Sequence, residues 1–173
     1  ISSGGTYKQI KKMGFKCEEV SKYTNFAEML DGRVKTLHPK IHSGILFDRS
    51  KKKHVNQMRS NKFESIDLVI VSFYPFEETL NKTSNKKMII ENIDVGGPSM
   101  VRAAAKNHKD VVIITDVEDY PNFVKEIKKF NGRTSFNFRE KMASKAFCQT
   151  AYYDSLISNW FNSILGDKFP RRK

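Results

Sequence analysis

Long apolar runs and cysteines are scarce in this sequence. No stretch approaches the ~18 consecutive apolar residues of a membrane span, which argues against an integral membrane protein. Its two cysteines, Cys17 and Cys148, lie far apart. Because a disulfide framework needs more cysteines and a zinc site needs clustered ligands, we expect two reduced, structural thiols. The sequence begins without Met and without the basic and apolar regions of a signal peptide, so we expect a trimmed chain that carries no secretion signal.

The composition is that of a folded protein with a strong positive charge. The chain has 173 residues, of which 39% are hydrophobic and 12% aromatic, which excludes wholesale disorder and fits one domain. The net charge is +12, with basic ends and a slightly acidic middle. Such a charge predicts phosphate-bearing partners, either nucleic acid or small phosphorylated metabolites, or else only a solvated surface. Lys51–Lys53 and Arg171–Lys173 contain no aromatic residue, which disfavours nucleic acid.

Strand and helix patterns alternate along the chain. The β-branched runs Asp67–Phe73 and Val111–Thr115 predict strands buried on both faces, and Cys17–Val20 is a weaker candidate. Apolar spacing and capping residues predict helices over Thr6–Met13, Pro98–Lys106, Val117–Lys129 and Asn137–Leu165, the last as one helix or a pair. The alternation predicts an α/β fold, doubly wound, with a mostly parallel sheet and helices on both faces.

Two segments gather groups that bind phosphate. Ser3–Thr6 has two glycines and hydroxyls at a helix start, where free N–H groups suit an anion; the alternative is a tight turn capped by Thr6. Asp31–Pro39 holds Arg33, Lys35 and Thr36 in one loop. His38 and His42 are spaced for one helix face, but no third ligand is evident, so we expect no metal site.

Two further segments carry candidates for proton transfer. Tyr74 follows the predicted strand Asp67–Phe73, at the strand end where open α/β sheets bind ligands; the alternative is an aromatic core cluster. Asp94 and Lys106 lie at the two ends of the helix that contains Pro98. They could act together in proton transfer. The alternative is that Asp94 only caps the helix and Lys106 is a solvated lysine. The helix separates them by about 12 Å, which a long side chain, a broken helix or a neighbouring subunit would have to bridge.

Together these segments resemble a known family. The quoted motifs, with DGRVKTLHP at 31–39, IDVGG at 93–97 and RAAAKNH at 102–108, are similar to those of the IMP cyclohydrolase domain, the N-terminal part of a bifunctional purine biosynthesis enzyme. Thr150–Asp154 fits the same family's late helix. The resemblance implies a methylglyoxal-synthase-like fold. It also implies an enzyme that closes the purine ring of a formylated aminoimidazole carboxamide ribonucleotide to give IMP and water.

The resemblance also implies particular residues and partners. Its catalytic residues correspond to Lys35, Tyr74, Asp94 and Lys106. Its nucleotide-binding positions correspond to Ser3, Gly4, Gly5, Thr6, Arg33, Val34, Lys35, Thr36, Val71, Ser72, Asp94 and Val95. It implies a purine nucleotide substrate, no metal or organic cofactor, a cytoplasmic homodimer, and a formyltransferase domain in the longer protein. It implies neither nucleic acid nor a membrane as partner.

The chain departs from the family pattern at both ends. The family's first strand, phosphate-binding loop and helix have no counterpart here. We therefore expect residues 1–165 to be an N-terminally truncated cyclohydrolase domain and residues 166–173 to begin a linker. Ser72 stands where many relatives carry Asn. The alternatives are a phosphate-sensing regulatory domain of the same fold, a methylglyoxal synthase, which needs a further acidic base, and a basic nucleic-acid-binding domain.

Overall fold

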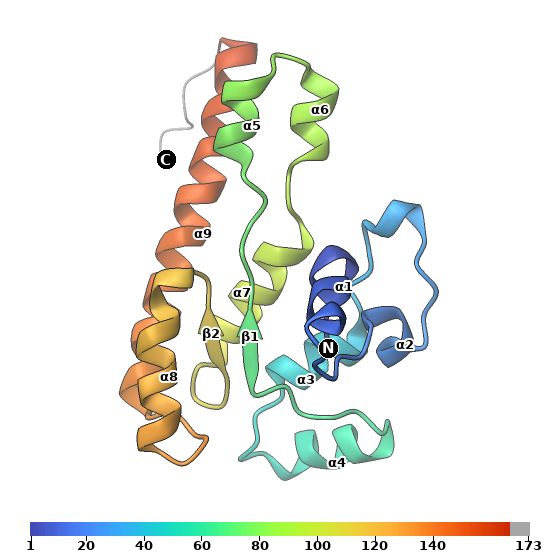
Figure 1. The fold of residues 1–173 in the computed structure, drawn as a ribbon, viewed down its shortest axis with the longest axis vertical. Coiled ribbons are helices and arrows are strands. Elements are labelled where there is room, and N and C mark those ends of the chain that lie inside the picture. The colour runs from blue at the N-terminus through green and yellow to red at the C-terminus, as the bar shows by residue number, and fades with distance from the viewer. Residues whose placement is uncertain (167–173) are drawn as a thin grey trace. The chain divides into compact units, whose positions relative to one another are not determined.

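The chain forms two compact units, Ile1–Ile66 and the part from Asp67 onward, each with its own buried residues. The structure is a computed structural model, and it describes residues 1–166 (Figure 1). The predicted linker, residues 166–173, lies outside the described residues except for Gly166, which ends the last helix with a φ of 71°.

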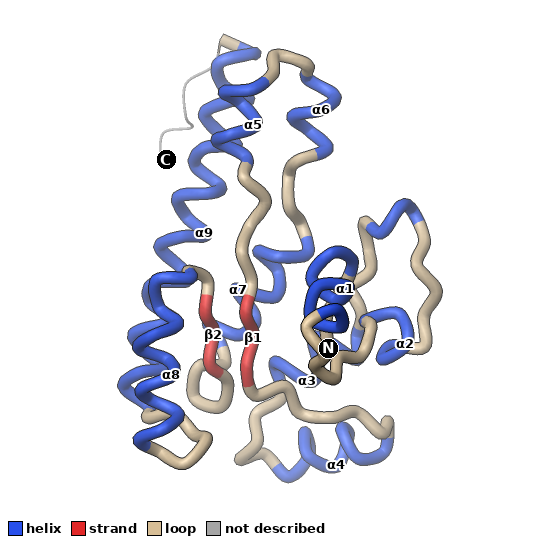
Figure 2. The backbone as a smooth tube through the Cα atoms, viewed as in Figure 1, coloured by secondary structure: helices blue, strands red, loops and turns tan. Residues whose placement is uncertain are grey.

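The first unit is mostly helical (Figure 2). Its elements are α1 (Gly4–Lys12), α2 (Val20–Thr24), the 3-10 turn η1 (Leu30–Gly32), α3 (Pro39–Leu46) and α4 (Lys52–Ser60). Val20, Tyr23, Ile41, Ile45 and Met58 are its buried apolar residues. The prediction of a strand at Cys17–Val20 is wrong except for one parallel bridge between Ser2 and Glu19, because α2 already begins at Val20.

Helix α1 begins earlier than the sequence predicts. Its N-cap is Ser3, and Thr6 lies inside the first turn, so the predicted capping role of Thr6 is wrong. The reason is that Gly4, with a φ of 54°, starts the helix from a conformation that a residue with a side chain rarely adopts.

The second unit contains the sheet. Strands β1 (Leu68–Ile70) and β2 (Val112–Ile114) pair in parallel, with Leu68 opposite Val112 and Ile70 opposite Ile114. Both strands fall inside the predicted runs, so the predicted α/β class with a parallel sheet is confirmed. Burial on both faces is confirmed for β2, whereas Leu68 and Ile70 of β1 are exposed. The two strands differ in burial because α9 (Phe136–Leu165) packs against β2 and covers it.

The other helices of this unit connect and cover the strands. The crossover from β1 to β2 runs through α5 (Phe76–Lys82), α6 (Lys86–Glu91) and α7 (Gly96–Lys106). Helix α7 contacts both strands and packs against α9. Its buried positions include Ala103, Ala104 and Ala105, small side chains that allow two helices to approach closely. Pro98, predicted at the first position of this helix, is its third residue.

The C-terminal elements agree with the predicted pattern. Asp116 caps a 3-10 turn, η2 (Val117–Asp119), by accepting from the Glu118 N–H at 2.9 Å, and α8 (Tyr120–Lys129) follows. The predicted helix or helix pair is one helix, α9, capped by Ser135. None of the described helices combines the length and the apolar character that crossing a membrane requires. Both cysteines are free.

Candidate functional site

The first unit brings the two predicted phosphate-binding segments together. A Cβ added to Gly4 at the start of α1 would lie 3.9 Å from Lys35 Nζ. The ammonium of the second segment therefore lies beside the helix N-terminus of the first. The N–H groups of a first helical turn have no partner within the helix, and the helix dipole makes this end positive. Together with Lys35 they have the charge that suits an anion, and phosphate binding here stays a prediction.

Backbone geometry explains the position of Lys35. Leu30, Asp31 and Gly32 all have positive φ, at 51°, 52° and 84°, so the chain turns sharply before Arg33. A Cβ on Gly32 would lie only 2.8 Å from Lys35 Cε, so a side chain at this position would displace the lysine. The glycine in the DGRVKTLHP motif thus serves the packing of Lys35 as well as the turn.

Lys35 has a counter-ion that the sequence analysis missed. Glu28 Oε1 lies 3.5 Å from Lys35 Nζ. The Glu28 side chain is 49% exposed, so the ion pair is weak in water and a phosphate group could replace it. Glu28 lies outside the motifs and carries no signal in the sequence. Of the remaining predicted residues in this loop, Arg33 is exposed, and Val34 and Thr36 are half-buried.

In the second unit, Val71 and Ser72 lead out of the sheet. The Val71 N–H donates to the Ile114 carbonyl at 3.0 Å, which extends the parallel ladder one residue past β1. Ser72 and Tyr74 follow at the carboxyl end of this strand, as predicted, and Tyr74 is 55% exposed. The phenol of Tyr74 is therefore accessible, whereas Phe73 and Phe76 belong to the aromatic core.

The Asp94 carboxylate lies at the N-terminus of α7. Its Oδ1 accepts from the Gly97 N–H at 2.8 Å, and the carboxylate also accepts from the backbone N–H of Tyr74. Burial raises the pKa of Asp94, and these two hydrogen bonds oppose the rise. The contact with Gly97 agrees with the predicted capping role of Asp94. Its proton-transfer role stays a prediction, and partial burial with a raised pKa is typical of residues that perform one.

Gly97 is required by this arrangement. A Cβ at position 97 would collide with the Asp94 carboxylate and would lie 2.9 Å from its Cγ. Gly97 is buried, whereas Val95, the predicted binding residue next to Asp94, is 57% exposed. In the IDVGG motif, the Asp94 carboxylate therefore packs against the first turn of α7, and position 97 has no room for a side chain.

Lys106 lies at the other end of the same helix. Helix α7 runs without interruption from Gly96 to Lys106, about 15 Å at ~1.5 Å per residue, and Lys106 is exposed. Of the three ways in which Asp94 and Lys106 might be brought together, a broken helix is therefore wrong. Arg139 of α9 fixes the turn after Lys106 by donating to the His108 and Lys109 carbonyls, each at 2.8 Å.

The histidine pair has ordinary structural roles. His38 caps α3, and its Nδ1 accepts from the Lys40 N–H at 3.1 Å. His42 is half-buried, and burial lowers its pKa. Within residues 1–166 no three side chains of the metal-binding types lie close enough together to hold an ion.

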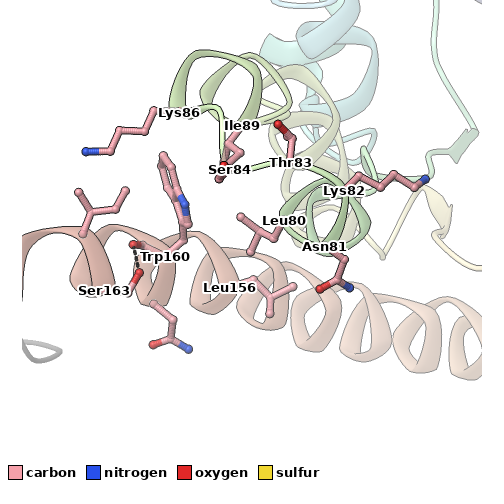
Figure 3. A pocket seen from close by; sticks show the side chains of 12 residues that line it. Leu80, Asn81, Lys82, Thr83, Ser84, Lys86, Ile89, Leu156, Trp160 and Ser163 are labelled. Atoms are coloured by element: carbon pink, nitrogen blue, oxygen red, sulfur yellow. Dashed lines mark hydrogen bonds between the residues drawn. The ribbon is translucent and has the colours of Figure 1, made fainter.

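An open groove of about 670 Å³ lies elsewhere in the second unit (Figure 3). Leu80 and Ile89, from the α5–α6 hairpin, and Leu156 and Trp160, from α9, form its apolar floor. Lys82, Thr83, Ser84 and Lys86 supply polar groups at its edge. None of the predicted site residues lines this groove.

The chain is an α/β protein, and each unit holds candidate residues of its own. Lys35 lies beside the α1 N-terminus in the first unit, and Asp94 accepts from the Tyr74 and Gly97 N–H groups in the second. The family profile described as "MGS-like domain" matches residues 1–99, and the profile "AICARFT/IMPCHase bienzyme" matches residues 104–173. The chain belongs to the MGS-like domain family.

Curated relatives agree over the whole chain. The bifunctional purine biosynthesis protein PurH of Leptospira biflexa is 50% identical over 171 residues, 98% of this chain and 33% of that protein. PurH of Bradyrhizobium diazoefficiens is 49% identical over 165 residues, 95% of this chain and 31% of that protein. The chain thus spans about a third of the length of these relatives. The resemblance to bifunctional purine biosynthesis proteins is confirmed.

A solved structure shows the same fold. The protein described as "Crystal structure of ForH" superposes with a TM-score of 0.80 and 30% identity, covering 92% of this chain and 83% of its own. This agreement confirms the fold that the resemblance implied.

Proposed function

We propose that this chain is an IMP cyclohydrolase that closes the purine ring of 5-formamidoimidazole-4-carboxamide ribonucleotide. The carboxamide nitrogen forms a bond to the formyl carbon, and its proton passes to the formyl oxygen. The hydroxyl of the resulting ring carbon then leaves as water while the former formamide nitrogen loses its proton. Both stages move protons, and the first develops negative charge on oxygen. The reaction needs no oxidant or reductant.

The proposed roles are those that the family resemblance implies, and the chemistry of the side chains is compatible with them. The helix start at Ser3, Gly4, Gly5 and Thr6, with Arg33, Val34, Lys35 and Thr36, binds the nucleotide, and its phosphate takes the place of Glu28 beside Lys35. Lys35 also stabilises developing oxyanion charge. Tyr74, Asp94 and Lys106 move the protons, and Val71, Ser72 and Val95 line the substrate. Much of the rate comes from holding the two ends of one flexible substrate together.

The observation that carries the proposal is the similarity to PurH proteins over the full length of this chain. The geometry supports it, because Lys35 lies beside the α1 N-terminus and Asp94 is half-buried with a raised pKa. The phosphate-sensing alternative would use the first feature, but it has no need for the second.

We further propose the assembly and location of the protein. The chain acts as a cytoplasmic homodimer, within a longer protein that also carries a formyltransferase domain. The unbroken α7, with Asp94 and Lys106 at opposite ends, supports the dimer, since a second copy can supply the group that one helix keeps apart.

A ring-closure assay on the formylated substrate tests the proposal. The full-length protein should produce IMP, and Lys106→Ala should lower the rate by about 10²–10⁴-fold, the usual contribution of a general acid or base. IMP should still raise the melting temperature of this variant. Lys141→Ala is the matched control, because it removes another exposed lysine, on α9.

Absence of ring closure by the full-length protein, together with a melting temperature that IMP leaves unchanged, would contradict the enzyme. Stabilisation by inorganic phosphate without any turnover would instead favour the regulatory domain.

A further inference from the structure

Tyr153 of α9 reaches the loop that carries Asp94. The Asp94 N–H donates to the Tyr153 hydroxyl oxygen at 2.8 Å. The same hydroxyl donates to the Asn92 carbonyl at 3.4 Å. One phenol group therefore binds the main chain on both sides of Ile93, and these contacts join residues about sixty positions apart in the sequence.

The surroundings of Tyr153 hold its ring in place. Its exposure is only 5%, and its ring lies 5.0 Å from that of Phe73 and 6.2 Å from that of Phe76. Phe73 directly precedes Tyr74, so the same ring also packs against the segment that carries the second proton-transfer candidate. A buried phenol hydroxyl needs hydrogen-bond partners, and here both partners belong to the Asp94 loop.

Three contacts from different segments then define where Asp94 lies. Tyr153 holds its backbone nitrogen, while the Gly97 and Tyr74 N–H groups hold its carboxylate. The two contacts to the carboxylate come from the loop after β1 and from the first turn of α7, and only Tyr153 among the three comes from the long helix α9. Removing its hydroxyl would leave the Asp94 N–H without this acceptor and free the loop from α9.

We propose that Tyr153 is a positioning residue for Asp94, acting through the loop 92–94. The inference rests on the proposed ring closure, in which Asp94 moves protons. Tyr153 does not touch the substrate. Its hydroxyl holds the main chain of residues 92–94 in a fixed position against α9. The Asp94 carboxylate therefore stays at the start of α7.

The test compares two adjacent tyrosines on one helix. Tyr153→Phe keeps the ring and removes the hydroxyl. Tyr152→Phe is the matched control, since the Tyr152 hydroxyl contacts the exposed Glu77 carboxylate at 3.1 Å and not the Asp94 loop. We expect kcat of Tyr153→Phe to fall about tenfold, with KM changed less than twofold, and kcat of Tyr152→Phe to stay within twofold of the wild type.

Two further readouts separate positioning from packing. In Tyr153→Phe the Asp94 amide should exchange its hydrogen faster. The acid limb of the kcat profile should move to lower pH, because a looser loop hydrates the carboxyl and lowers its pKa toward the ordinary value. Phe76→Leu removes a ring packed on Tyr153 and leaves the hydroxyl, so it should lower the melting temperature without moving the acid limb.

The outcomes distinguish this inference from the proposed function. A wild-type full-length protein without ring closure contradicts the function, while the Asp94 amide exchange still decides whether Tyr153 holds the loop. With an active wild type, Tyr153→Phe at kcat within twofold of wild type overturns the positioning role. If Tyr153→Phe does not fold, 3-fluorotyrosine in place of Tyr153 keeps the packing but weakens the oxygen as an acceptor. It should then give a smaller shift in the same direction, and an unchanged rate and amide exchange would overturn the role.

Discussion

At the scale of single residues, Asp94 has a structural role at the start of α7 and a proposed role in proton transfer, and its burial costs stability. Its carboxylate accepts hydrogen bonds at the start of α7, yet burial outweighs them and raises its pKa. A raised pKa means that the folded state binds the proton more tightly than the unfolded state does. The ionised form is therefore unfavourable in the folded protein, as is common at functional sites.

The pH dependence of unfolding tests this reading of Asp94. An unfolded Asp titrates near 3.8, and the folded carboxyl titrates above that value. The wild type should therefore lose stability relative to Asp94→Asn as pH rises from 3.8 through the folded pKa, and the difference should then stay constant. Urea unfolding of both proteins between pH 3 and 8 measures it. A difference that stays flat over this range contradicts the raised pKa.

At the scale of elements, the start of α7 depends on a glycine that helix propensity alone would disfavour. Ala normally stabilises a helix by ~1 kcal/mol relative to Gly. At position 97, however, a Cβ would collide with the Asp94 carboxylate. We therefore expect Gly97→Ala to destabilise the protein by about 1–3 kcal/mol, the usual cost of overpacking. Thermal unfolding gives the sign.

The control for Gly97→Ala removes the Asp94 carboxylate, with which the new methyl group would collide. Asp94→Ala combined with Gly97→Ala should recover most of the loss caused by Gly97→Ala, because the new methyl group then has room. Additive losses in the double-mutant cycle would show that the strain lies in the backbone at position 97 and not in contact with Asp94.

The end of α7 is fixed by a long-range contact from α9. The Arg139 guanidinium donates to the His108, Lys109 and Thr134 carbonyls, at 2.8, 2.8 and 2.5 Å. Charge-assisted bonds of this kind contribute about 1.5–3 kcal/mol. Arg139→Ala should therefore lower the free energy of unfolding by about 2 kcal/mol, a fall in melting temperature of roughly 4–8 °C. Arg139→Lys should recover less than half of the loss, since one ammonium cannot reach three carbonyls, whereas full recovery would mean that charge alone acts there.

At the scale of the whole chain, the net charge of +12 raises the question of whether the protein binds nucleic acid. A basic surface binds duplex DNA through counterion release, so such binding should be weak and should vanish between 50 and 200 mM salt. The proposed nucleotide site instead uses specific donors beside Lys35 and the α1 N-terminus. IMP should therefore raise the melting temperature at 200 mM salt, where duplex DNA should not. Tight, salt-resistant DNA binding would reverse this conclusion.

Much of the fold could be predicted because it depends on local signals. The apolar runs around Val69 and Ile113 gave the strands, and Asp116 and Gly166 mark helix ends through their side chain and backbone. Helices α3 to α6 were not predicted, because short helices depend on tertiary packing for their stability. Phe76 and Ile89, for example, are buried against Tyr153, at the far end of the chain.

The candidate site was predicted from its motifs but not from its contacts. The motifs identified Lys35, Tyr74, Asp94 and Lys106 because each lies in a short, specific string of residues. Glu28 and Arg139 lie outside such strings, and Tyr153 lies in the quoted segment Thr150–Asp154, which assigned it no role. Their partners lie from five to about sixty residues away in the sequence, and only the folded chain brings them together.

The sequence by itself determined the class of protein, the two strands and the residue types of the site, because periodicity and motifs are local properties of a chain. The tertiary structure decided which groups meet. It placed Lys35 beside the start of α1, set Asp94 between Gly97 and Tyr153, and kept Lys106 at the far end of an unbroken helix. The physical reason is that burial and hydrogen bonding act between segments distant in sequence. These interactions set the positions of the candidate groups, and burial raises the pKa of Asp94.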